Sequence, residues 1–256
     1  MTKLSSLSLL SAIFAICFAL MASPAVAQDA KPPHWSYQGA TDPSHWGSLG
    51  SAYAVCSTGH LQSPIDINGA KKTDLPPLKM NYSNAPLNII DNGHSVQINY
   101  PEGSSLTVGD KTYTLKQFHF HHPAEEEIGG KKYDLVAHLV HADPDGHLAV
   151  IAVLFKRGAA NSLLDTLWKS VPSEKEKATD VSSVTVNAKD LLPANLGYYT
   201  FQGSLTSPPC SEGVTWYVLK SHETLSEDQL ANFAKLYPHN ARPIQPTNGR
   251  QILESK

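Results

Sequence analysis

The sequence predicts a mostly β protein with short peripheral helices, and two observations support this prediction. Many short segments alternate apolar and polar residues, and Gly, Pro, Asn and Asp turn signals separate them. Helical spacing of apolar residues is confined to a few short segments. With 256 residues, of which 41% are hydrophobic and 17% charged, the chain is long enough for one large globular domain.

Residues 1–27 have the pattern of a secretory signal peptide. Lys3 provides a positive start, an apolar run extends from Leu7 to Met21, and Ala25–Ala27 are typical of a cleavage site. The run is shorter than the roughly 20 residues that span a bilayer, and no later stretch is apolar enough to do so. We therefore expect no membrane span and a single exported domain over residues 28–256, periplasmic or secreted.

Removal of the signal peptide leaves two cysteines, Cys56 and Cys210, in a protein bound for an oxidising compartment. They are expected to form one disulfide, with two free thiols as the alternative. A lipoprotein anchored through Cys17 is a further alternative, but it would need a small residue where the sequence has Ile16.

The mature chain has no long linker, repeat or low-complexity tract between Trp35 and Leu253. Alternating strands are expected at Ser95–Tyr100, Ser105–Val108, Thr112–Leu115 and Val181–Val186. His147–Phe155 is continuously apolar in its later part, which favours a strand buried on both faces in the middle of a sheet. Helices are expected at Asn161–Lys169 and at Ser226–Leu236, the second capped by Ser226.

The net charge of -3 and the pI near 6.4 leave no broad basic field that would attract nucleic acid or anionic lipid. Nucleic acid is therefore not expected as a partner. The chain is expected to be a monomer or a homodimer.

Two histidines face one way in the expected strand Gln117–His121. Because side chains alternate across a strand, His119 and His121 share a face and the two phenylalanines share the other. A neighbouring strand could bring His138 into the same space, and three neutral imidazoles with one open position describe a catalytic zinc site.

This pattern alone is weak evidence, because histidines are common in strands as hydrogen-bonded core residues. It does not decide between His138, His122 and His141 as the third ligand, although alternation points His122 and His141 to the opposite faces. The remaining histidines are expected on the surface or in packing roles: His34, His45, His60, His147, His222 and His239.

Gln117–His121 followed by Ala137–His141 resembles the zinc signature of the α-class carbonic anhydrases, in particular the exported bacterial type. Further segments resemble that family in the same order: His34–Tyr37, Gln62–Ile67, Asn92–His94, Gly203–Cys210 and Asn240–Pro246. The resemblance implies a large, twisted, mostly antiparallel central sheet. It also implies an enzyme that uses Zn²⁺ on His119, His121 and His138 for reversible hydration of CO2 to bicarbonate and a proton, by attack of a zinc-bound hydroxide.

The family resemblance assigns roles to further residues. Thr206 would orient the hydroxide and donate to Glu125, and His94 would shuttle protons. Ser207 would contact substrate beside Thr206. An apolar wall for CO2 would be formed by Val140, Val150, Leu205 and Trp216. Gln117 would hold His119, and the backbone carbonyl of Asn240 would hold His121.

The sequence departs from the family beside the third ligand. Family members commonly have a glutamate two residues before this histidine, where the chain has Val136. We hypothesise that water or a backbone carbonyl replaces the carboxylate, that zinc binds about 10-fold more weakly, and that Val136→Glu would slow zinc loss. Bacterial members also have Ser at the Ala124 position and His at the Glu126 position.

Two other functions are alternatives for a protein of this kind. A carbonic anhydrase-like binding module without catalysis would typically lack one of the zinc histidines, and all three are present. Ester hydrolysis as the main task is the other alternative, but the apolar wall and His94 fit a small neutral gas better.

Overall fold

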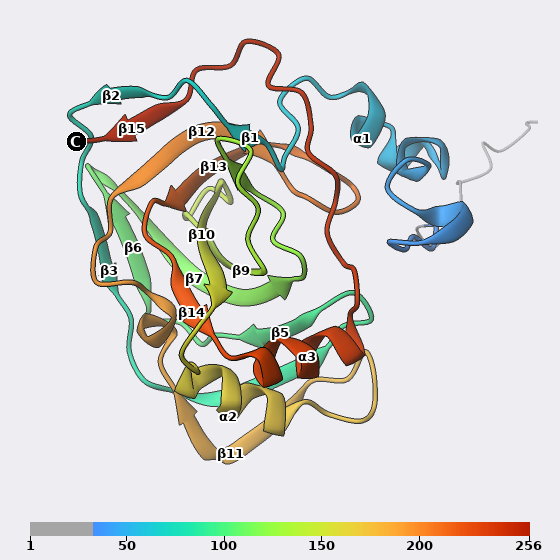
Figure 1. Ribbon diagram of the computed structural model, residues 1–256, viewed down its shortest axis with the longest axis vertical. Coiled ribbons are helices and arrows are strands. Elements are labelled where there is room, and N and C mark those ends of the chain that lie inside the picture. The colour runs from blue at the N-terminus through green and yellow to red at the C-terminus, as the bar shows by residue number, and fades with distance from the viewer. Residues whose placement is uncertain (1–32) are drawn as a thin grey trace, which may run out of the picture. The chain divides into compact units, whose positions relative to one another are not determined.

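The computed structural model describes residues 33–256, and its main element is a large twisted β-sheet (Figure 1). Its 13 strands are β2 (Lys71–Thr73), β3 (Leu78–Asn81), β4 (Ala85–Asp91), β5 (Val96–Asn99), β6 (Ser105–Val108), β7 (Lys111–His121), β9 (Leu135–Ala142), β10 (Leu148–Arg157), β11 (Thr179–Val186), β12 (Tyr198–Ser204), β13 (Glu212–Leu219), β14 (Glu223–Leu225) and β15 (Leu253–Ser255). The predicted signal peptide, residues 1–27, lies outside the described part.

The strand order is β11-β4-β5-β7-β9-β10-β13-β12-β15-β2, with β14 beside β10 and with β6 joining β3 to β7. Most neighbours are antiparallel, whereas β10–β13, β10–β14 and β15–β2 are parallel. A separate parallel pair joins β1 (Asp66–Ile67) to β8 (Glu127–Ile128). The predicted mostly β class is confirmed, and the strand expected at His147–Phe155 corresponds to β10, which begins one residue later and lies in the interior of the sheet.

The helices are short: α1 (Val55–Thr58), α2 (Ser162–Ser170), α3 (Glu227–Leu236) and four 3₁₀ turns at Gly39–Thr41, Trp46–Ser48, Ser51–Tyr53 and Ala188–Leu191. The Asn161 side chain caps α2, and Ser226 with Gln229 forms a capping box at the start of α3. The Gln229 amide also donates to Asp165 at 2.7 Å, so the two helices lie side by side (Figure 1). Both predicted helices are confirmed.

A β-bulge at Lys116 determines which side chains of β7 reach the core. The pairing of β7 with β9 shifts register between Leu115 and Gln117. Before the shift, Leu115 is buried in the large apolar cluster; after it, Phe118 and Phe120 enter that cluster. Because a bulge inserts one residue, it moves Gln117, His119 and His121 to the opposite face of the sheet.

His141 and His122 lie away from the face that carries His119. His141 is fully buried with Nε2 2.7 Å from the Tyr82 hydroxyl, and burial lowers its pKa to about 4. His122 Nδ1 lies 2.7 Å from the carbonyl oxygen of Asp134. Both histidines thus have partners other than His119 and His121, in agreement with the alternation of side chains along a strand.

The predicted disulfide between Cys56 and Cys210 is confirmed. It connects α1 to the loop that follows β12, and it packs in a small cluster with Trp46 and Tyr53. The Cys210 N–H donates to the Ser207 carbonyl, so the crosslink also fixes the segment that carries Thr206.

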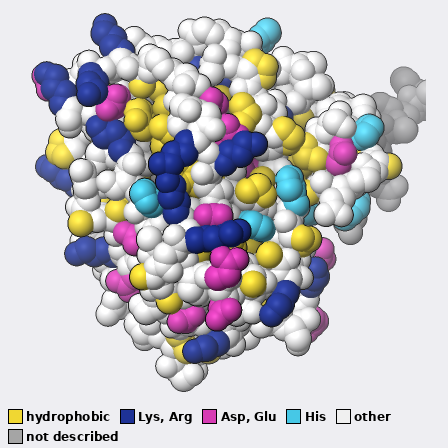
Figure 2. Space-filling model, in the orientation of Figure 1, with side chains coloured by type: hydrophobic (Ala, Val, Ile, Leu, Met, Phe, Trp, Pro, Cys, Tyr) yellow, Lys and Arg dark blue, Asp and Glu magenta, His cyan; other side chains and the backbone are white. Residues whose placement is uncertain are grey.

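Basic and acidic side chains are interspersed on the face shown in Figure 2. Among residues 33–256, none of the helices has the length and apolar content that a membrane crossing requires.

Candidate metal centre

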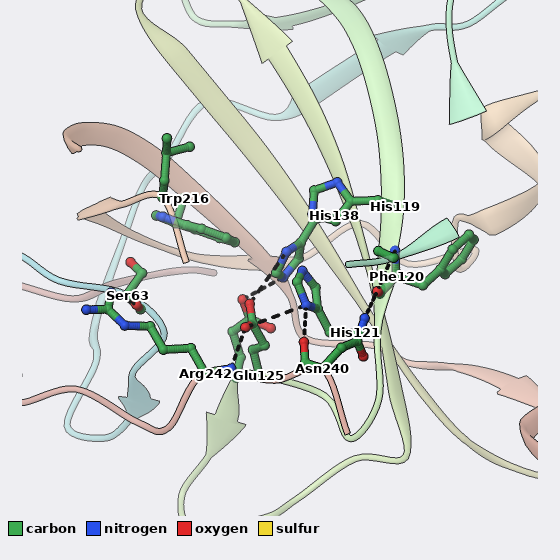
Figure 3. Close-up of polar contacts among 12 residues, drawn as sticks. Ser63, His119, Phe120, His121, Glu125, His138, Trp216, Asn240 and Arg242 are labelled. Atoms are coloured by element: carbon green, nitrogen blue, oxygen red, sulfur yellow. Dashed lines mark hydrogen bonds and ion pairs between the residues drawn. The ribbon is translucent and has the colours of Figure 1, made fainter. Parts of the chain in front are cut away.

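Three imidazoles converge on the cavity side of the sheet. His119 on β7 lies directly opposite His138 on β9, and His121 follows two residues along β7 on the same face. The ring centroids are 4.8–5.5 Å apart, and one nitrogen from each ring lies within 4.8 Å of the others. Figure 3 shows the rings arriving from the two neighbouring strands.

Hydrogen bonds occupy one nitrogen of each β7 imidazole, and the other nitrogen has no hydrogen-bond partner among residues 33–256. His119 Nδ1 lies 2.8 Å from the Gln117 side-chain oxygen, and His121 Nδ1 lies 2.7 Å from the Asn240 carbonyl oxygen. His121 Nε2 is buried, and no hydrogen-bond partner for it exists within the described residues. A buried unpartnered nitrogen beside two other imidazoles fits a metal ion as the missing partner.

His138 also has a partner, which corrects the expectation drawn from Val136. Its Nε2 lies 2.9 Å from a carboxylate oxygen of Glu126, so the Nδ1 atom is left to face the other histidines. We expected a water molecule or a backbone carbonyl at the second nitrogen of His138, and this expectation was wrong. The expectation of weaker zinc binding therefore loses its basis. The Val136→Glu substitution would only add a second carboxylate beside a nitrogen that already has one.

Burial controls the charge of these imidazoles. It lowers the pKa of His119 to about 3 and that of His121 well below its usual range. Burial also disfavours the charged form of His138, but the carboxylates of Glu126 and Glu125 outweigh it and raise the pKa. Neutral imidazoles are the form that binds metal, and a proton on His138 would be released when a metal binds.

Two carboxylates are buried beside the histidines without a lysine or arginine ion pair in residues 33–256. Glu125 is 2% exposed and Glu126 0% exposed, and each has one oxygen without a hydrogen-bond partner there. Glu125 lies 3.6 Å from His121 Nδ1 and 3.9 Å from His138 Nδ1. Buried anions need a compensating charge, and a divalent cation on the histidines would supply it.

Glu125 is held by the backbone N–H of Arg242, which donates to its Oε1 at 2.7 Å (Figure 3). Burial raises the pKa of Glu125 to about 7, whereas His138, the Arg242 N–H and the nearby Thr206 hydroxyl favour the charged form. Thr206 is buried two residues after the end of β12. Thr206 and Glu125, which are far apart in the sequence, therefore lie together.

A cavity of about 150 Å³ connects the histidines to the surface-facing turn after β4. Its lining includes His119, His121, Ser207 and His94. The His94 ring is half-buried and stacks on Trp35 with 3.7 Å between ring centroids and 8° between planes. Burial lowers the pKa of His94. The structure thus brings His94 to the same cavity as two of the three imidazoles.

The predicted apolar wall lies next to His138. Val140, Val150 and Trp216 occupy one row across β9, β10 and β13, one step along the sheet from the row of His119 and His138. Leu205 packs against the same apolar cluster. The Trp216 ring lies edge-on to the His138 ring, with centroids 4.9 Å apart. Its indole N–H donates to the Ser204 carbonyl, so the ring presents only carbon atoms to the histidine.

A second group of possible metal ligands lies on the hairpin between β9 and β10. Asp143, Asp145 and His147 could each offer one ligand atom. However, Asp145 and His147 are exposed, and the carboxylate of Asp143 accepts from the backbone N–H groups of both. These contacts are those of a stable turn.

The sequence of residues 41–256 matches the family model described as eukaryotic-type carbonic anhydrase. The chain belongs to this carbonic anhydrase family. It is 43% identical to a carbonic anhydrase of Pectobacterium carotovorum over 242 residues, which covers 94% of this chain and 96% of the relative.

Solved carbonic anhydrase structures have the same fold. A hyperthermostable carbonic anhydrase from an active hydrothermal vent chimney superposes with a TM-score of 0.84 at 45% identity, covering 87% of this chain and all of the other. The α-carbonic anhydrase of Thermovibrio ammonificans, solved with the inhibitor sulfanilamide, gives 0.82 at 39% identity, with 88% and 99% covered. The predicted family is confirmed.

Sequence reasoning missed some residues of this carbonic anhydrase site. Glu126 sits in an acidic run, and its partner lies on a separate strand. The side chain of Asn240 was also missed: its amide donates to the carbonyls of His94 and Phe120, while its oxygen accepts from the His122 N–H. A buried Asn with every group satisfied ties the His94 turn to β7, and no local pattern in the sequence signals this.

Proposed function

We propose that this chain hydrates CO2 reversibly to bicarbonate and a proton, with Zn²⁺ held by His119, His121 and His138. The observation that carries the proposal is the convergence of three imidazole nitrogens that no described residue occupies, each backed by a hydrogen bond at the ring's other nitrogen. Zinc held this way lowers the pKa of a water molecule to about 7, which supplies a nucleophile at neutral pH.

Thr206 and Glu125 orient the reacting oxygen. A carboxylate accepts hydrogen bonds only, so the nearby Thr206 hydroxyl would donate to Glu125 and keep its own lone pairs for the nucleophile. The Arg242 N–H and burial hold Glu125 in place. Ser207, which lines the cavity directly after Thr206, would contact substrate.

CO2 is apolar and binds best against a surface that offers no competing hydrogen bonds. The row of Val140, Val150 and Trp216, with Leu205 beside it, would offer such a surface next to His138. This wall favours CO2 hydration over ester hydrolysis as the main task, because a larger ester needs polar groups to hold it.

His94 exports the proton that each turnover releases. The Nδ1 and Nε2 atoms of an imidazole can accept a proton on one side and release it on the other. We expect His94→Ala to lower kcat by about 100-fold in weak buffer, because water alone would then have to carry the proton. Imidazole in the buffer should restore the rate, and His147→Ala, an exposed histidine away from the cavity, should have no effect. A wild-type kcat in His94→Ala would contradict this role.

Metal removal tests the proposal as a whole. Stopped-flow CO2 hydration should show acceleration that is lost after treatment with a zinc chelator and returns on adding one equivalent of Zn²⁺. Sulfanilamide should inhibit the restored activity. A zinc-loaded chain that hydrates CO2 no faster than buffer would contradict the proposal and favour a binding module.

We also propose export to the periplasm or the extracellular space, with residues 1–27 as signal peptide. The Cys56–Cys210 disulfide supports an oxidising compartment.

A further inference from the structure

Glu126 is a fully buried carboxylate with one hydrogen bond. Its Oε1 atom lies 2.9 Å from His138 Nε2, and its Oε2 atom is buried without a partner among the described residues. Within residues 33–256, no lysine or arginine forms an ion pair with it. A carboxylate is expensive to bury, so its one hydrogen bond among the described residues, with a proposed zinc ligand, points to a role at the metal centre.

The backbone on both sides of Glu126 is fixed. On one side, Glu125 accepts from the Arg242 N–H. On the other, Glu127 begins β8, which pairs in parallel with β1, and the Gly129 N–H donates to the Ile67 carbonyl at 3.0 Å. The carboxylate therefore reaches His138 from the segment before β8, whose backbone is held on both sides and which is separate from the strand that carries this histidine.

The strand β9 itself offers His138 no acceptor. Val136 lies two residues earlier on the same face, is fully buried and packs in the apolar cluster that contains Trp216. A His138 ring that did not donate to Glu126 would leave a buried N–H beside Val136 and Trp216. The carboxylate thus selects the tautomer that carries hydrogen on Nε2 and presents Nδ1 to the metal.

We propose that Glu126 is the positioning residue of the third zinc ligand, acting from the segment before β8 in place of a carboxylate on β9. This inference rests on the proposed zinc site. Glu125 and Glu126, although adjacent, then have separate tasks: Glu125 serves Thr206 and Glu126 serves His138.

The test is the rate at which zinc leaves the folded holoenzyme. Zinc-loaded wild type, Glu126→Ala, Glu126→Gln and Glu127→Ala are mixed with excess dipicolinate, and bound zinc is followed over time. Glu127 is the matched control, because its side chain is directed to Lys132 at 3.7 Å and does not contact His138. The Co²⁺-substituted proteins are compared by visible absorption, which reports ligand geometry independently of turnover.

We expect zinc loss about 10- to 100-fold faster in Glu126→Ala, a smaller increase in Glu126→Gln, and the wild-type rate in Glu127→Ala. The Co²⁺ spectrum should change in the Glu126 variants alone. The glutamine variant keeps the size of the side chain and serves if the alanine variant does not fold. Zinc loss within about twofold of wild type in both Glu126 variants, or an equal effect in Glu127→Ala, would overturn the inference while leaving an active zinc-loaded wild type, and hence the proposed function, intact. A wild type that binds no zinc would refute both.

Discussion

His121→Ala should abolish both stoichiometric zinc binding and CO2 hydration. His121 Nε2 is buried and has no partner within the described residues, and alanine supplies no ligand atom in its place. Two imidazoles would remain, fewer than the three protein ligands of a catalytic zinc site. We expect the purified variant to contain little zinc after dialysis, by elemental analysis, and to hydrate CO2 at the rate of buffer alone in stopped flow.

His147→Ala is the matched control for this experiment, because His147 belongs to the second group of possible ligands, with Asp143 and Asp145. This variant should retain one zinc per chain and full activity. Retention of zinc in His121→Ala together with its loss in His147→Ala would move the metal to the exposed hairpin and contradict the site proposed above.

Replacing both disulfide cysteines should destabilise the protein by about 5 kcal/mol in the chain-entropy model. Cys56 and Cys210 are 154 residues apart, so the crosslink removes a large amount of conformational freedom from the unfolded chain. The free energy of unfolding of Cys56→Ala/Cys210→Ala, measured by urea titration followed by tryptophan fluorescence, should fall accordingly.

Wild type held in a strong reductant is the natural control for the double variant, since it lacks the crosslink but retains both sulfur atoms. Both samples should unfold at a lower urea concentration than the oxidised protein. A loss below about 1 kcal/mol in the double variant would show that the unfolded chain is not constrained as the model requires.

Parts of the fold that depend on local sequence were predictable. β6 spans the residues that alternation predicted, and Asn161 and Ser226 cap the two helices at the predicted starts. The Lys116 bulge was not predictable, because its register shift is defined only relative to β9. Strands of two or three residues, such as β1 and β8, are too short to show an alternation of apolar and polar residues. They are defined only by their pairing with a neighbouring strand.

The candidate site divides in the same way. Alternation placed His119 and His121 on one face, but His138 depends on the pairing of β7 with β9, which family resemblance rather than pattern supplied. The expectation about Val136 failed because it considered acceptors on the same strand as the ligand. Glu126 reaches His138 through tertiary packing. Its position in an acidic run of the sequence instead predicts a side chain exposed to solvent.

The bulge in β7 divides the strand into two segments in which the buried positions alternate out of phase. Tyr113 and Leu115 are buried at odd positions, whereas Phe118 and Phe120 are buried at even ones. The hydrophobic cluster therefore remains continuous along the whole strand, while the polar side chains of the second segment face the cavity. Without this added residue, unbroken alternation from Tyr113 and Leu115 would turn His119 and His121 into the hydrophobic core and Phe118 and Phe120 toward the cavity.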